Sequence, residues 1–374
     1  MKLKLSEEQE MLKKMARDFL TDKCPKKLVK QMEESDTGYS EQLWQEMADL
    51  GWMGLAFPEK YGGGGMSFLH LAVLLEEMGR ACLPGPFFST VILGSLPILD
   101  IGSEEQRQEY LPKLASGQKI CTLALSEPDN LNYDATAIKV QATSDNSNYI
   151  INGAKLFVPD AHISDYLLCV ARTEHGDGVT IFLVDAKNPK INYNVLKTMA
   201  GDKLCEVVFN QVPVSKDNII GQLNQGQNEV KRIVQRAALA KCCEMVGNIQ
   251  QVLEMTVDYA KERKQFDRTI GSFQVIQHYC ADMATDVDGA RFSTYQAAWM
   301  LSEGLPCTKE VAIAKTWICE ASHRVISLAH EIHGAIGVSM EHDLQFYTRR
   351  AKAGELSFGD ADFYREVVAR EIGL

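Results

Sequence analysis

The first third of the chain places apolar side chains three or four positions apart, the spacing that gives a helix one buried face. Leu12 and Met15 belong to such a stripe within residues 6–35. Ser6 offers a capping hydroxyl where this stripe begins. Residues 83–100 are strongly apolar, and we expect them to be core. The pattern predicts helices over residues 6–35, 40–50, 67–80 and 102–117.

At Ile120 the pattern changes to short runs rich in β-branched residues, separated by turn residues. No helical segment separates one run from the next, which favours an antiparallel sheet over parallel βαβ units. The sequence also lacks GxGxxG, which argues against a Rossmann fold. The predicted strands are residues 121–128, 138–143, 148–158, 166–173, 179–185 and 205–214.

After Gly221 the helical spacing returns and continues to the end of the chain. The predicted helices are residues 226–262, 271–302, 306–334 and 342–371, the last with breaks around Gly354 and Gly359. The expected fold class is therefore α+β. It comprises an N-terminal all-α domain (1–118), a middle antiparallel β domain (119–222) and a C-terminal four-helix bundle (223–374).

Composition narrows the class of protein. The chain has 374 residues, 45% of them hydrophobic, which is enough for two or three domains. A formal net charge of −11 argues against general nucleic-acid binding. No apolar run reaches the roughly 20 residues of a membrane span, and no secretory leader is evident. The 10 cysteines lack zinc-type spacing, so we expect no metal site and reduced thiols in the cytoplasm.

The segment YAKERKQFDRTIGSFQVI, residues 259–276, ends one predicted helix, turns through Asp267–Thr269 and starts another. It brings Arg263, Phe266 and Gln274 close together. A guanidinium binds two oxygens at once and is therefore a suitable partner for a diphosphate. Spacing alone favours an ordinary helical hairpin that has a charged elbow.

The order Arg-x-x-Phe followed by Ile-Gly-x-Phe-Gln resembles the most recognisable segment of the acyl-CoA dehydrogenase family. GWMGLAFPEKYGGGG, residues 51–65, resembles the GW-x-GL…PEEYGG-x-G signature of the same family. The helical–β–helical order extends the resemblance over essentially the whole chain. It implies FAD as cofactor, oxidation of an acyl-CoA at Cα–Cβ, and transfer of electrons to an electron-transferring flavoprotein. It also implies a homo-oligomer built as a dimer of dimers.

Three further motifs carry the resemblance. LSEP, residues 125–128, is similar to V-T-E-P on the pyrimidine side of the flavin. In KLFVP, residues 155–159, Phe157 replaces the tryptophan of K-x-W-I-T that stacks on the ring. EIHGAIG, residues 331–337, resembles Q-x-x-GG-x-G along the adenosine diphosphate. The implied flavin contacts are Leu125, Ser126, Phe157, Val158, Pro159, Arg263, Gln265, Phe266, Ile270, Phe273, Gln274, Glu331, His333, Gly334, Ala335, Asp360 and Asp362.

The catalytic base departs from the family pattern. The usual base is the glutamate of Y-E-G-T, and the matching stretch here, LSFGD, has Phe358 at that position. A minority of the family uses a glutamate on the first long C-terminal helix, where Ala237 stands here. We take Asp360 as the candidate base, with Asp100 and Glu244 as alternatives. For each of these acids taken singly, a surface or capping carboxylate is the favoured explanation.

The resemblance implies substrate contacts at Asn132 and Gly359, although residues 129–134 are also compatible with a plain polar turn. The FG-type ending is shared with relatives that oxidise ring or branched acyl thioesters. Two other functions remain open: a base-less, non-catalytic subunit of a heteromeric acyl-CoA dehydrogenase, and a cyclic acyl-CoA dehydrogenase or acyl-CoA reductase with a different acid or base.

Overall fold

The computed structural model describes residues 4–131, 133–145, 148–173 and 178–374. The chain divides into two compact units, each assembled from segments distant in the sequence. The first comprises Met1–Val29, Ser67–Leu83 and Ala238–Leu374, and the second comprises Lys30–Met66 and Pro84–Ala237. The boundaries 1–118, 119–222 and 223–374 stay a prediction.

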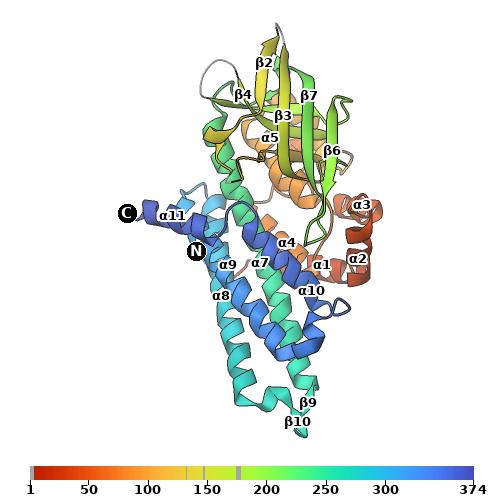
Figure 1. Cartoon of the computed structure of the whole chain (residues 1–374), viewed down its shortest axis with the longest axis vertical. Coiled ribbons are helices and arrows are strands. Elements are labelled where there is room, and N and C mark those ends of the chain that lie inside the picture. Colours follow the sequence, from red (N-terminus) through yellow and green to blue (C-terminus); the bar gives the residue numbers. More distant parts are fainter. Residues whose placement is uncertain (1–3, 132, 146–147, 174–177) are drawn as a thin grey trace. The chain divides into compact units, whose positions relative to one another are not determined.

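The first unit is helical. Its long C-terminal helices run side by side, including the part of α7 that follows Ala237 (Figure 1). Of the two predicted breaks, the one around Gly359 is present and separates α10 from α11. The break predicted around Gly354 is absent, because Gly354 lies buried inside α10. The helices are α1 (Glu7–Lys23), α4 (Phe68–Ala81), α7 (Gly226–Glu262), α8 (Gln274–Ser302), α9 (Thr308–His333), α10 (Leu344–Leu356) and α11 (Ala361–Glu371), with a 3₁₀ turn at Gly334–Val338.

The helix predicted over residues 6–35 is interrupted. It forms α1 and α2 (Lys26–Glu34), because Pro25 has no N–H to donate and disfavours a helical conformation at Cys24. The predicted cap at Ser6 is present. Its hydroxyl accepts from Gln9 N at 3.2 Å, and the Gln9 side chain accepts from Ser6 N at 2.9 Å.

A buried carboxylate joins three helices of the first unit. Glu76 on α4 is 1% exposed. It accepts from Lys13 on α1 at 2.9 Å and from the Tyr295 hydroxyl on α8 at 2.6 Å, and Arg291 lies 3.4 Å away. Burial raises the pKa of Glu76, but the charges of Lys13 and Arg291 outweigh it and the net pKa is lowered. Glu76 therefore remains an anion that ties α1 and α8 to α4.

Helices α4 and α7 cross at two glycines. A Cβ built on Gly79 would lie 1.9 Å from the Glu244 carbonyl oxygen, and one on Gly247 would lie 1.7 Å from the Glu76 carbonyl oxygen. The two backbones are therefore in direct contact, with no side chain between them.

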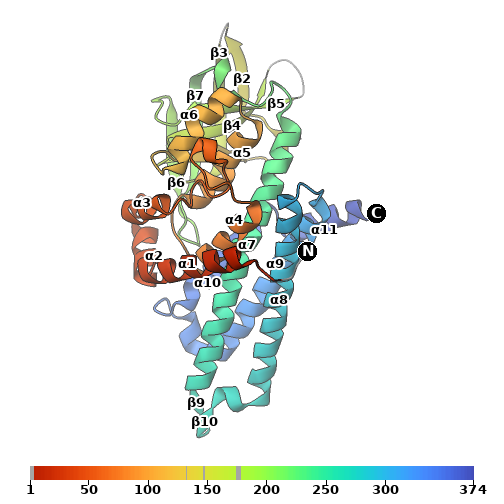
Figure 2. The same cartoon turned by 180° about the vertical axis from the view of Figure 1, so that it is seen from behind.

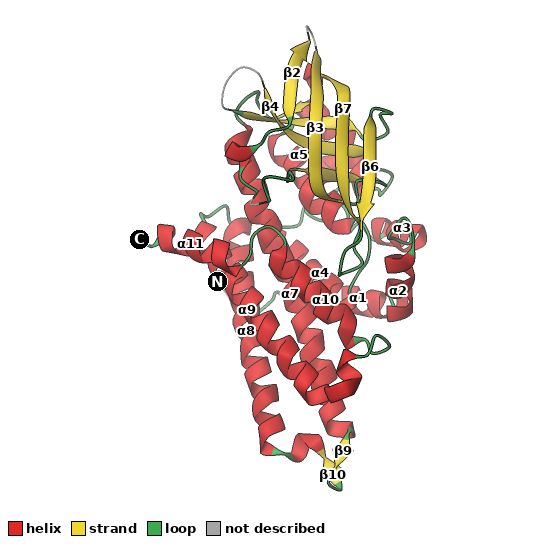
Figure 3. Ribbon diagram, in the orientation of Figure 1, coloured by secondary structure: helices red, strands yellow, loops and turns green. Residues whose placement is uncertain are grey.

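The second unit is built on a mixed sheet, with strands in the order β6-β7-β3-β2-β4-β5-β8 and β1 beside β4. Figure 3 shows β2, β3, β7 and β6 side by side. The sheet is not wholly antiparallel as expected, because both β1 and β2 pair parallel with β4. The strands are β1 (Cys121–Ala124), β2 (Gln141–Asp145), β3 (Asn148–Pro159), β4 (Tyr166–Thr173), β5 (Val179–Asp185), β6 (Ile191–Leu196), β7 (Leu204–Ser215) and β8 (Ile219–Ile220).

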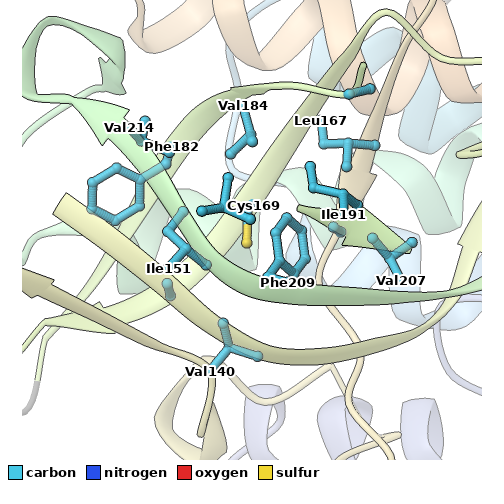
Figure 4. Packing of buried hydrophobic residues seen from close by; sticks show 14 of the residues in the cluster. Val140, Ile151, Leu167, Cys169, Phe182, Val184, Ile191, Val207, Phe209 and Val214 are labelled. Carbon is cyan, nitrogen blue, oxygen red and sulfur yellow. The ribbon is translucent and has the colours of Figure 1, made fainter. Parts of the chain in front are cut away.

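Apolar side chains from most strands of the sheet form one core cluster (Figure 4). On the side seen in Figure 2 lie α5 (Leu96–Ile101) and α6 (Glu104–Ala115). Most of the apolar stretch expected to be core is buried, and it forms a π-helix, η2 (Phe88–Ser95), followed by α5. Helix α3 (Glu41–Asp49) and the glycine-rich turn around Glu59–Tyr61 complete the unit.

We expect Gly79→Ala to destabilise the protein by about 2 kcal/mol or more, although the same change in an open helix stabilises by roughly 1 kcal/mol. The added methyl group has to push α4 and α7 apart. Chemical denaturation measures the difference. Ala281→Gly on the exposed face of α8 is the propensity control, with an expected cost of about 1 kcal/mol. A stabilised Gly79→Ala variant would contradict the close backbone contact.

Candidate functional site

Phe157 is displayed by an irregularity in the sheet. The pairing of β3 with β7 shifts register between Lys155 and Val158, so Leu156 and Phe157 form a bulge. Phe157 has φ 55° and is 45% exposed, while the next residue, Val158, is buried. A bulky residue in the left-handed region is uncommon and marks candidate functional positions. The bulge turns a flat aromatic ring outward, as expected for a ring that stacks on a planar ligand.

The LSEP and KLFVP segments meet within the second unit. Leu156 N donates to Ser126 O at 2.8 Å, and Lys155 Nζ donates to Leu125 O at 3.0 Å. Leu125 and Ser126 lie just beyond the end of β1 and are buried. Pro159 pairs with Leu204 at the end of β3. The structure therefore brings together two groups of predicted flavin contacts that are 30 residues apart in sequence.

The RKQFDRT segment forms a small hairpin at the end of α7 and α8 (Figure 1). Strands β9 (Lys264–Gln265) and β10 (Arg268–Thr269) are joined by Phe266 and Asp267, one position before the predicted turn. Both turn residues have positive φ, 53° and 61°, which is the type I′ geometry that favours Asn-Gly. Phe266 is 86% exposed. The Phe266 ring meets the Phe273 ring edge-on, with centroids 6.2 Å apart, and is otherwise exposed. The tip thus presents an aromatic side chain from a backbone conformation that such residues rarely adopt.

Four other predicted contacts surround this hairpin. Ile270 N donates to Arg263 O at 2.8 Å and closes its base. The Phe273 ring lies beneath the Arg268 guanidinium at 4.0 Å, and Gln274 begins α8. The Arg263 side chain is exposed, and no acidic residue in the described ranges forms an ion pair with it. A guanidinium in this state remains available to an anionic ligand.

The EIHGAIG segment follows the end of α9. Glu331, Gly334 and Ala335 are exposed, but His333 is buried. The His333 ring stacks on Tyr259 at 4.5 Å, and its Nδ1 donates to Ala329 O at 2.8 Å. Burial lowers the pKa of His333, although the bond to Ala329 opposes that shift. The imidazole therefore packs under the segment, and Gly334 and Ala335 are the parts presented to solvent.

The segment with the candidate base lies between α10 and α11. Phe358 and Gly359 have φ 59° and 98°. The Asp360 carboxylate accepts from Phe363 N at 2.9 Å and caps α11. Asp362, in the first turn of α11, pairs with Arg365. Asp360 thus has a structural role at one oxygen, and no residue in the described part of the chain hydrogen-bonds its other oxygen.

A buried cation fixes the end of α10 ahead of this segment. Lys315 on α9 is fully buried and donates to Gly354 O at 2.5 Å and Glu355 O at 3.2 Å. These carbonyls belong to the last turn of α10, where a positive charge is favourable.

The alternative acids have partners of their own. Asp100 is partly exposed and pairs with Arg236, and Glu244 pairs with Lys241. Ala237 is buried on α7. Asn132 lies outside the described residues.

Sequence reasoning missed the buried lysines Lys155 and Lys315 and the carboxylate of Glu127 that meets Lys155. A lysine on an otherwise apolar face, as in VAIAKTWICEA, is the signal that could have identified Lys315.

Among the described residues no His, Cys, Asp or Glu cluster could hold a metal ion. All ten cysteines are free thiols. Within the same ranges, no helix has the length and apolar character needed to cross a membrane.

Three family models match the chain: the N-terminal domain of acyl-CoA dehydrogenase over residues 6–118, the middle domain over 122–212 and the C-terminal domain over 224–373. A probable acyl-CoA dehydrogenase of Bacillus subtilis, YngJ, is 33% identical over 384 residues, with 100% of both chains covered. The NADH-dependent acryloyl-CoA reductase of Anaerotignum propionicum is 30% identical, covering 100% of this chain and 96% of its own.

A chain of the ChsE4–ChsE5 complex from Mycobacterium tuberculosis has the same fold, with a TM-score of 0.91 and 28% identity. The match covers 100% of this chain and 99% of that chain. The protein belongs to the acyl-CoA dehydrogenase family of FAD-dependent oxidoreductases. The residues present fit this cofactor, because Phe157 offers an exposed ring face and Arg263 an exposed guanidinium.

The strained hairpin tip gives an experiment in which stability and cofactor retention change in opposite directions. We expect Phe266→Asn combined with Asp267→Gly to stabilise the protein by about 1 kcal/mol, because Asn-Gly suits a type I′ turn. The same variant is expected to retain less FAD, because it lacks the exposed ring. Thermal melts and the flavin absorbance of purified protein measure the two effects. Asp267→Gly alone is the control, with the stability gain and unchanged flavin content. Equal FAD retention in both variants would exclude a flavin role for Phe266.

Proposed function

We propose that this chain is an FAD-dependent acyl-CoA dehydrogenase that introduces an α,β double bond into a CoA thioester and passes the electrons to an electron-transferring flavoprotein. The observation that carries the proposal is the exposed Phe157 ring. It stands on a strained bulge hydrogen-bonded to the Leu125–Ser126 segment. An aromatic residue is costly to hold in this way unless a planar ligand covers it.

The residues divide the work by their chemistry. When bound, FAD supplies the two-electron oxidation. Phe157 stacks on the ring, and Leu125 and Ser126 contact its pyrimidine side. Arg263 and the other residues at the hairpin bind the diphosphate of a second copy's cofactor, within a dimer of dimers. The free oxygen of Asp360 accepts the proton from Cα of the substrate.

We further propose a ring or branched acyl group as substrate. Phe358 stands where the family usually has a glutamate, so the proton acceptor must approach from another position. Asp360 lies two residues further along the chain, after Gly359. Its carboxylate therefore approaches Cα of the substrate from a different position than the usual glutamate, which suits an acyl group of a different shape from a linear chain. The ten free thiols are consistent with a cytoplasmic protein.

A specific observation favours a second candidate, the base-less subunit of a heteromeric dehydrogenase. One Asp360 oxygen already caps α11, which is the role of an ordinary structural carboxylate. The ChsE4–ChsE5 relative is itself named as a complex of two proteins. A third candidate, acyl-CoA reduction, is supported by the full-length similarity to an acryloyl-CoA reductase.

Flavin absorbance of the chain purified alone distinguishes these candidate functions. An active dehydrogenase is yellow, and its flavin absorbance near 450 nm bleaches when a saturated acyl-CoA is added. Trials with linear, branched and cyclic thioesters identify the acyl group, and reoxidation by an electron-transferring flavoprotein tests the acceptor. Colourless protein that turns yellow only when mixed with a related subunit supports the heteromer. Bleaching by NADH, followed by recovery of the flavin absorbance when an enoyl-CoA is added and converted to the saturated acyl-CoA, supports reduction.

Asp360 can be tested without disturbing the helix that it caps. We expect Asp360→Asn and Asp360→Ser to slow bleaching roughly a hundredfold or more, because neither side chain accepts the Cα proton. Both residues are good N-caps, so the melting temperature is expected to stay near that of the wild type. Asp360→Ala is the matched control, since it also removes the cap and costs about 1 kcal/mol. Unchanged bleaching in Asp360→Asn would rule out Asp360 as the base.

A further inference from the structure

Lys155 and Glu127 form a buried ion pair behind the proposed flavin contacts. The Lys155 side chain is 0% exposed and that of Glu127 is 3% exposed. Lys155 Nζ donates to Glu127 Oε1 at 2.8 Å and to Leu125 O at 3.0 Å. The carboxylate also accepts from Lys139 N at 2.7 Å and from Val140 N at 3.0 Å. The ammonium is thus fixed by a carboxylate that is itself fixed by two backbone amides.

Stability alone does not account for such a pair. Removing two charges from water is expensive, and well-packed apolar residues of similar volume often stabilise a fold equally well. The pair is therefore better explained by the geometry that it imposes, as a hypothesis that can be tested for this protein.

That geometry concerns one peptide unit. In a trans peptide the C=O of one residue and the N–H of the next point in opposite directions. Lys155 holds Leu125 O toward the interior, which aims the Ser126 N–H the other way. No acceptor for this N–H occurs among the described residues, whereas the following amide, Glu127 N, donates to Asn130 O at 3.1 Å. A backbone donor at a buried residue requires a partner, and a ligand can supply one.

We propose that the Glu127–Lys155 pair is a positioning device that aims the Ser126 N–H at an acceptor on the pyrimidine edge of the flavin. The inference rests on the proposed role of Leu125 and Ser126 as flavin contacts. A preorganised amide in this place strengthens FAD binding and, by stabilising negative charge on the reduced ring, raises the reduction potential.

The test compares a broken pair with a neutral one. Lys155→Met leaves a buried carboxylate unpaired, so its melting temperature falls by about 5 °C or more. Lys155→Met combined with Glu127→Gln removes both charges and recovers most of that loss. The double variant still lacks the donor to Leu125 O. We therefore expect it to bind FAD at least roughly tenfold more weakly than the wild type, with a lower flavin potential.

FAD affinity is measured by quenching of flavin fluorescence when FAD is titrated into full-length apoprotein. Lys139→Met with Asp129→Asn is the matched control. It removes an ion pair from the same segment, but both side chains are exposed, so FAD affinity and melting temperature are expected to remain unchanged.

Ser126→Pro and Ser126→Ala provide an independent comparison if the double variant does not fold. Proline removes the N–H, whereas alanine keeps it and removes only the hydroxyl. We expect Ser126→Pro to bind FAD about tenfold more weakly than Ser126→Ala. Equal affinity in this comparison, or wild-type affinity and potential in a folded double variant, overturns the positioning role and leaves the proposed function intact. Wild-type protein that binds no FAD overturns both.

Discussion

An aromatic ring stays exposed near the C-terminal end of β3 because the β3–β7 ladder loses its register next to it. Regular pairing alternates side chains between the two faces, and a bulge breaks that alternation at one place. In this chain the bulge falls between Lys155, which is drawn fully into the interior, and Val158, which is buried. Phe157 is the residue left over, and it adopts a left-handed backbone conformation. The proposed cofactor site depends on this local irregularity.

Buried charged side chains have different structural roles in the two units. In the second unit a buried ammonium orients a backbone segment of the proposed flavin site. In the first unit Lys315 neutralises carbonyls at the end of α10, and Glu76 binds helices that are distant in the sequence. Each buried charge has several hydrogen-bond partners, which is the condition under which burial is tolerated. The segment with Phe358 and Asp360 is thereby attached to a rigid helix end.

The order of elements and most of their limits could be predicted from the sequence, because helical and alternating patterns depend on local burial. The long helix over 226–262 matches its predicted limits. Strand β6 was not predicted, since its sequence INYNVL is largely exposed and has no regular buried face. The parallel pairing of β1 and β2 with β4 was also missed, because strand partners far apart in the sequence leave no local signal. The site was predicted through motif resemblance, whereas the positive φ of Phe157 and the burial of Lys155 are three-dimensional properties.

The glycine crossing of α4 and α7 has a mechanical meaning. Side chains between two helices act as a compliant layer, since rotamer changes let one helix slide past the other. At Gly79 and Gly247 this layer is missing, and main chain rests on main chain. A displacement of α7 at the level of these glycines has to move α4 with it, so the two helices move together as one rigid body.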